Sequence, residues 1–143
     1  MLMPDVNVLV YAHREDTREH AEHAEWLSRL AGGDEPFALS EVVLQGFVRV
    51  VTNSKIFVRP STLDEALAFV HELRRQPTCH LYRPGARHWD IFVDLCRRAR
   101  ATAGLVADAY HAAVAIEHGC EWVTNDTDFA RFPGLRWRPP YQA

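Results

Sequence analysis

Short apolar segments alternate along this chain with longer segments of helical periodicity, and this alternation constrains the fold more than any other feature. Strands are predicted at residues 1–6, 36–39, 79–83, 121–124 and 135–138. A short helix or an extended turn is predicted at residues 7–13. Helices are predicted at residues 17–30, 41–51, 63–75, 88–100 and 105–118, and a single helical turn at residues 129–132. Strands that alternate with helices are typical of an α/β fold, with a mainly parallel sheet and helices on its faces. We expect one domain over residues 1–143.

The length and composition are those of an ordinary globular domain. With 143 residues, 48% of them hydrophobic and 24% charged, the chain can bury a core without disulfides or a structural metal. No apolar run approaches the roughly 20 residues of a membrane span. The N-terminus has neither a basic leader nor a small-residue cleavage site. We therefore expect a cytoplasmic protein that does not insert into a membrane.

Cysteine and histidine do not predict a metal site. The three cysteines, Cys79, Cys96 and Cys120, form no C-x-x-C pair, so free thiols are expected. His20 and His23 would share one face of a helix, but a solvated helix explains that spacing equally well.

Four carboxylates lie where an apolar segment meets a turn or a helix: Asp5, Glu41, Asp108 and Asp126. Burying an unpaired charge costs several kcal/mol or forces protonation, so acids at the edges of core segments suggest a shared pocket. Ligands in parallel sheets collect outside the carboxyl ends of the strands, where Asp5 and Asp126 are expected. The chain's net charge is −3, and without these four acids it would be +1. The overall charge therefore does not argue against a nucleic-acid partner.

Each of these acids also has a purely structural explanation. Asp5 could cap the following helix, and Glu41 and Asp108 would be favoured in a first helical turn by the helix dipole. Asp126 lies in an Asn-Asp turn of an ordinary kind. Its neighbour Asp128 is the residue that we expect to cap the turn at residues 129–132.

A pocket of carboxylates would suit a hard divalent cation such as Mg²⁺, with Mn²⁺ as a substitute, because both prefer oxygen ligands. Such an ion can lower the pKa of a water and stabilise charge on a phosphodiester. Four acids could hold one ion or two side by side, and the sequence leaves both arrangements open.

Four motifs, in order, resemble those of PIN domains. They begin at Asp5-Val-Asn-Val-Leu and continue with Ser40-Glu41-Val-Val-Leu, Ala107-Asp108-Ala-Tyr-His-Ala-Ala-Val-Ala and Thr124-Asn125-Asp126-Thr-Asp128-Phe129. More narrowly, the chain resembles VapC-type toxins, the nuclease half of a bacterial toxin–antitoxin pair. The resemblance covers nearly the whole chain, and none of the four acidic positions departs from the pattern.

The resemblance implies a metal-dependent ribonuclease with an α/β/α sandwich. By this analogy Asp5 and Asp108 are the principal Mg²⁺ ligands, Glu41 and Asp126 complete the acidic pocket, and Thr124 is a supporting polar residue. It also implies a homodimer and a VapB-type antitoxin whose tail enters the active-site groove. The expected reaction is in-line attack of a metal-activated water on RNA, which leaves a 5′-phosphate and a 3′-hydroxyl. Candidates for RNA contacts, by charge and loop position, are Arg14, Arg49, Lys55, Arg59 and Arg87.

Two other functions are compatible with parts of the sequence. A catalytically silent module that binds nucleic acid or an antitoxin would tolerate Asp5→Asn, whereas the nuclease would not. A small-molecule phosphohydrolase of the haloacid-dehalogenase type would need an aspartate two residues after Asp5, where the chain has Asn7. No glycine-rich phosphate loop ending in Lys-Ser or Lys-Thr is present.

Overall fold

A parallel five-stranded sheet lies at the centre of the protein. The computed structural model describes residues 1–141, so the predicted domain extends two residues beyond the described part. The strands are β1 (Leu2–Pro4), β2 (Phe37–Ser40), β3 (Cys79–Tyr82), β4 (Glu121–Val123) and β5 (Trp137–Arg138). They lie in the order β3-β2-β1-β4-β5, and every pairing is parallel. The predicted α/β class with a parallel sheet of short strands is confirmed.

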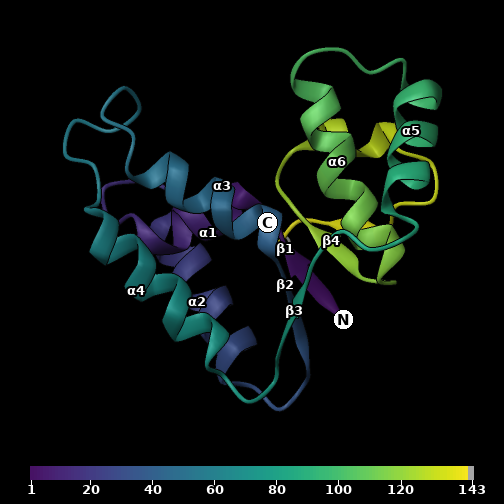
Figure 1. The fold of residues 1–143 in the computed structure, drawn as a ribbon. Helices are drawn as coiled ribbons and strands as arrows, with labels where there is room; N and C mark the ends of the chain where they lie inside the picture. The colour runs from purple at the N-terminus through teal and green to yellow at the C-terminus, as the bar shows by residue number, and fades with distance from the viewer. Residues whose placement is uncertain (142–143) are drawn as a thin grey trace.

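Helices cover both faces of this sheet. They are α1 (Val6–His13), α2 (His20–Gly32), α3 (Glu41–Val51), α4 (Leu63–Arg74), α5 (His88–Ala99), α6 (Gly104–Glu117) and the 3-10 helix η1 (Thr127–Arg131). Figure 1 shows α1 to α4 on one side of the strands and α5 with α6 on the other. Helix α1 packs against α2 and α3, whereas α5 packs mainly against α6. This is the α/β/α sandwich that the resemblance implied.

The boundaries of the first two helices differ from the prediction. Strand β1 ends at Pro4, and Asp5 is the N-cap of α1, whose Val6 amide donates to the Asp5 carboxylate. Thr17 does not cap α2, because its hydroxyl donates to the Arg14 carbonyl and closes the turn after α1. Helix α2 therefore begins only at His20. Local hydrogen bonds of Thr compete with helix capping in this way.

Two other helix starts follow the sequence closely. Ser40 accepts a hydrogen bond from the Val43 amide at the start of α3. Thr62 and Glu65 form a reciprocal capping box at the start of α4.

The core lies on both sides of the strands and is aromatic at its centre. Its largest fully buried side chains include Trp122, Phe37, Phe47 and Phe129. Asp5 is a buried carboxylate beside this core, with 7% of its surface exposed. Within residues 1–141, no helix is both long and apolar enough to cross a membrane.

Candidate active site at the carboxyl edge of the sheet

Asp5 lies at the end of the central strand with both carboxylate oxygens engaged. Oδ1 accepts a hydrogen bond of 2.6 Å from the Val6 amide, and Oδ2 accepts one of 2.7 Å from the Thr124 hydroxyl. Burial raises the pKa of Asp5 to about 6; the two hydrogen bonds oppose this shift, and the charge of Asp126 adds to it. The site therefore holds its deepest carboxyl in an environment that disfavours the negative charge.

Thr124 connects this carboxylate to the acidic turn after β4. Its side chain is buried, with 1% of its surface exposed. The hydroxyl donates to Asp5, while its oxygen accepts a hydrogen bond of 3.0 Å from the Asp126 amide. Thr124 thus contacts both the Asp5 carboxylate and the backbone of the acidic turn.

Asp108 faces the same place from α6. Burial, followed by the charges of Asp126, Asp5 and Asp128, raises its pKa to about 6. One carboxylate oxygen from each of Asp108, Asp126 and Asp128 lies within 4.8 Å of the others. Because like charges at this separation repel, the group favours a bound cation. The donors are all carboxylate oxygens, which fits Mg²⁺ or Mn²⁺ and does not favour a soft metal.

The capping role expected of Asp128 falls to Asp126, which also remains in the carboxylate group. Asp126, not Asp128, is the N-cap of η1, because its Oδ1 accepts a hydrogen bond of 2.9 Å from the Asp128 amide. The prediction that Asp128 caps this turn is wrong, because η1 begins at Thr127 instead of Phe129. Asp128 remains exposed and belongs to the carboxylate group.

The structure does not bring Glu41 to this group. Its carboxylate forms a salt bridge with Arg83, the residue directly after β3, and lines a separate cavity with Leu44 and Val48. Glu41, Leu44 and Val48 share one face of α3, whereas Val42 and Arg49 face α6. Glu41 therefore lies on the side of the helix that faces α4 and β3, and we correct its expected place in the acidic pocket.

A buried histidine beside the site was missed by the sequence analysis. His23 has 1% of its surface exposed, and its Nδ1 lies 2.7 Å from the Glu19 carbonyl oxygen. Nδ1 must carry the proton of that bond, so Nε2 of the neutral ring accepts from Asn125 Nδ2 at 2.8 Å. The His23 ring thus fixes the side chain of Asn125, the residue between Thr124 and Asp126 in the chain. Its helical spacing to His20 was the available signal, but a solvated helix explains that spacing equally well.

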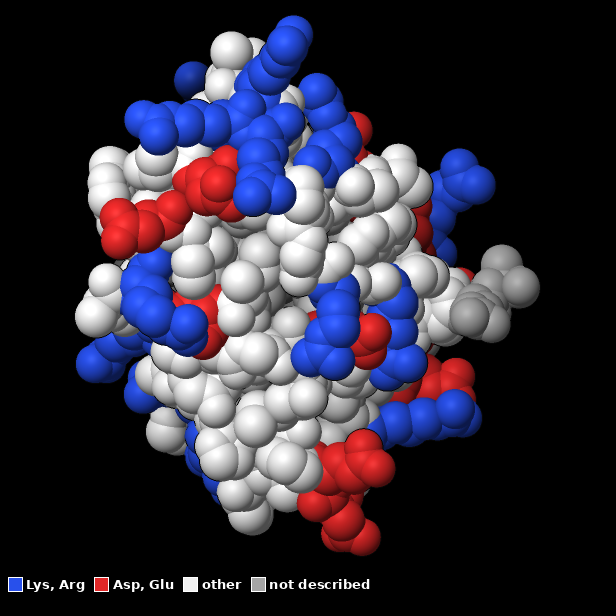
Figure 2. Space-filling model, turned by 90° about the vertical axis from the view of Figure 1, so that its right-hand side faces the viewer, with Lys and Arg blue, Asp and Glu red and all other residues white. Residues whose placement is uncertain are grey.

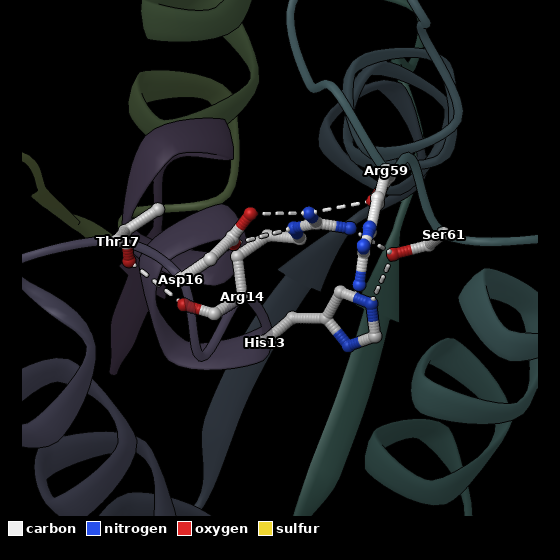
Figure 3. Close-up of polar contacts among 6 residues, drawn as sticks. All are labelled: His13, Arg14, Asp16, Thr17, Arg59 and Ser61. Atoms are coloured by element: carbon white, nitrogen blue, oxygen red, sulfur yellow. Dashed lines mark hydrogen bonds and ion pairs between the residues drawn. The ribbon is translucent and has the colours of Figure 1, made fainter.

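Two of the five candidate RNA-binding cations have structural roles instead. The Arg14 guanidinium is buried, forms a bidentate pair with Asp16 and donates to the Arg59 carbonyl and the Ser61 hydroxyl (Figure 3). These contacts tie the end of α1 to the loop after α3. Arg87 is likewise occupied, with its side chain donating to the Glu117 carbonyl. Arg49, by contrast, lines a cavity between α3 and α6.

Comparison with known proteins identifies the family. The family model described as "PIN domain" matches residues 2–135. The chain belongs to the PIN-domain family. This PIN domain is 48% identical over 140 residues to Ribonuclease VapC43 of Mycobacterium tuberculosis, covering 98% of this chain and 95% of the relative. It is 42% identical over 141 residues to Ribonuclease VapC25 of the same species, covering 98% and 99%. The recognised resemblance to VapC-type PIN domains is confirmed.

Solved structures show the same fold. The PIN-domain fold is shared with a chain of VapBC2 from Rickettsia felis, crystallised with a DNA fragment from its promoter. The TM-score is 0.70 at 21% sequence identity, over 96% of this chain and 97% of the other.

Proposed function

We propose that this chain is a Mg²⁺-dependent endoribonuclease and the toxin of a toxin–antitoxin pair. The observation that carries the proposal is the convergence of Asp108, Asp126 and Asp128 beside the buried Asp5 at the carboxyl edge of the sheet. The relatives at 42–48% identity are named ribonucleases, which supports a nuclease over a silent binding module. No observation favours a small-molecule phosphohydrolase.

Asp5 and Asp108 would hold the ion, with Asp126 and Asp128 completing its surroundings; Mn²⁺ could replace Mg²⁺. When bound, such an ion supplies a water of lowered pKa and neutralises charge on the phosphodiester. Thr124 orients the Asp5 carboxylate and, through the Asp126 amide, the turn that carries the other two acids. One of these two would take the proton from the attacking water. Glu41 is not part of this proposed site.

Basic side chains are available for the RNA backbone near the acidic group. Figure 2 shows Lys and Arg side chains gathered at the upper end of one face, at the height where α5 ends and α6 begins in Figure 1. Helix α5 is followed by Arg100 and contains Arg97 and Arg98 in its last turn; all three are exposed, and Arg98 is paired with Asp94. Helix α6 begins at Gly104 and carries Asp108 in its second turn. Phosphate contacts from such residues would position an RNA strand without reading its sequence.

An antitoxin is the second proposed partner. The solved VapBC structure pairs its PIN-domain chain with an antitoxin on promoter DNA, and we propose that a VapB-type chain binds this protein as well. A homodimer and a cytoplasmic location remain predictions. Light scattering of the purified chain, alone and with the product of a small adjacent open reading frame, would test both assemblies.

The decisive test is cleavage of total cellular RNA with Mg²⁺, mapped at the fragment ends. We expect 5′-phosphate and 3′-hydroxyl ends from the wild type, loss of cleavage in EDTA and loss in Asp5→Asn. Circular dichroism of the variant controls for folding. Equal cleavage by wild type and Asp5→Asn would refute the mechanism, and no cleavage by the wild type would favour the silent binding module.

A further inference from the structure

A cavity of about 470 Å³ lies between α3, α5 and α6, and two of its lining residues are chain neighbours of acids in the proposed site. Its wall includes Val6, the residue after Asp5, and Ala107, the residue before Asp108. The volume lies within the roughly 300–1,000 Å³ of sites that bind small organic groups. A group that fills this cavity would therefore lie next to whatever the acids act on.

One positive charge of this cavity has no acidic partner. Arg49 is exposed and lines the cavity, and no salt bridge involving it is found among residues 1–141. Arg83 and Arg98, in contrast, are each paired with an acid. Gln45, one turn earlier on α3, presents an exposed amide to the same space. A guanidinium and an amide at one wall can contact a phosphate oxygen and a base edge.

The opposite wall is aromatic. Phe92 of α5 and Tyr110 of α6 both line the cavity, with ring centroids 5.3 Å apart and planes at 81°. His111 completes this wall and is neutral near pH 7, because burial, followed by the charge of Arg49, lowers its pKa to about 4. Uncharged rings opposite a cation suit the flat face and the anionic backbone of one nucleotide.

We propose that this cavity binds the nucleotide of single-stranded RNA that adjoins the cleaved phosphodiester. Arg49 contacts a phosphate oxygen, Phe92 and Tyr110 contact the base, and Gln45 contacts the base edge. This subsite rests on the proposed ribonuclease function, since it places its nucleotide relative to the acidic group. We assign the cavity to RNA and not to an antitoxin side chain. The guanidinium of Arg49 has no acidic partner among residues 1–141 and lies outside the carboxylate group, where an RNA strand needs a cation for its phosphate.

The test measures binding of four fluorescein-labelled octaribonucleotides, A8, C8, G8 and U8, by fluorescence anisotropy in EDTA, where a metal-dependent nuclease does not cleave them. We expect Arg49→Ala to weaken binding about tenfold and to lower the salt dependence by about 0.7, the slope for one phosphate of a single strand. Phe92→Leu keeps an apolar side chain but removes the ring, and we expect about fivefold weaker binding. Arg74→Ala is the matched control, because Arg74 is an exposed helical arginine on the far side, in α4.

The outcomes separate this proposal from the proposed function. Wild type that binds none of the four oligonucleotides, or Arg49→Ala that binds as Arg74→Ala does, overturns the subsite. The same proteins are then assayed on total RNA with Mg²⁺. Loss of oligonucleotide binding in Arg49→Ala without cleavage by the wild type would leave the subsite standing and refute the nuclease. Weakened antitoxin binding with unchanged RNA binding would assign the cavity to the antitoxin and also overturn the proposal.

Discussion

The hydroxyl of Thr124 donates a 2.7 Å hydrogen bond to Oδ2 of Asp5, although the two residues are 119 positions apart in the chain. Because β1 and β4 are neighbours in the sheet, residues after their carboxyl ends meet. Thr124 also accepts from the Asp126 amide, so one buried hydroxyl orients both the central carboxylate and the acidic turn. The acidic site is thus fixed by the pairing of two strands.

Replacing this hydroxyl should therefore disturb both sides of the site. We expect Thr124→Val to lower the free energy of unfolding by about 1–3 kcal/mol, because the Asp126 amide and the Asp5 carboxylate each lose a buried partner. It should also reduce RNA cleavage strongly. Thr124→Ser keeps the hydroxyl and should retain most of the activity. Urea denaturation and cleavage assays check both effects, and equal activity of the Val and Ser variants would contradict the assigned contact.

The raised pKa of Asp5 predicts how stability depends on pH without metal. In the unfolded chain the pKa of this carboxyl is near its ordinary value of 3.8, whereas in the folded protein its pKa is about 6. Between these values the folded state holds a proton that the unfolded state has lost, so this group makes stability fall as pH rises from about 4 to about 6. At about 1.4 kcal/mol per pKa unit, the change is at most about 3 kcal/mol.

Asp5→Asn isolates that contribution from the other acids. Urea denaturation in EDTA across this pH range should show that the variant becomes more stable relative to the wild type as pH rises. The difference in the free energy of unfolding should reach its full size by about pH 7. Mg²⁺ should stabilise the wild type near pH 7 and leave Asp5→Asn unaffected. If the difference in the free energy of unfolding between the two proteins did not change with pH, the charge of Asp5 would not destabilise the folded state.

Glu41 and Asp108 should respond differently to loss of charge. Glu41→Gln removes a salt bridge whose partners are 51% and 70% exposed, so we expect a change in stability of about 0–1 kcal/mol and cleavage close to that of the wild type. Asp108→Asn should abolish Mg²⁺-dependent cleavage. Stability and cleavage are measured in parallel for both variants. Asp94→Asn, which changes an exposed acid on α5, is a further control. Loss of cleavage in Glu41→Gln alone would return that residue to the site.

Substitution of Asp126 and of Asp128 should have different effects on stability but similar effects on Mg²⁺ binding. Asp126→Ala removes the cap of η1 and should cost about 0.5–2 kcal/mol of the free energy of unfolding. Asp128→Ala removes an exposed carboxylate that caps nothing and should change stability by less than about 0.5 kcal/mol. Both should weaken Mg²⁺ binding, measured by calorimetry. Equal loss of stability in the two variants would contradict the capping assignment.

The layers and most elements of the fold could be predicted from sequence, because the helices show apolar stripes and two of them, α3 and α4, start at a Ser or Thr cap. The errors at the first two helices arose where a local side-chain hydrogen bond moved the boundary of an element. Thr17 bonds backward to Arg14, which moved the start of α2. Asp5 caps α1, which shortened β1 to residues before it.

The acidic site was predictable in part. Asp5 and Asp108 were identifiable because each interrupts an apolar segment. Glu41 satisfied the same rule, yet a first-turn residue can point to either side of its helix, and periodicity does not say which side faces the site. His23 could not be assigned from sequence because its function depends on Asn125, 102 residues later. Contacts of that range are set by the packing of the folded chain.

The position of β1 in the centre of the sheet has a consequence for synthesis of the protein. Asp5 is made first, but Asp108, Asp126 and Asp128 lie in the last quarter of the chain, and β4 must pair with β1 before they meet. A nascent chain emerging from the ribosome can form β1, β2 and the helices α1 to α3 long before it has this site. The acidic site of this chain is thus complete only when its translation is nearly finished.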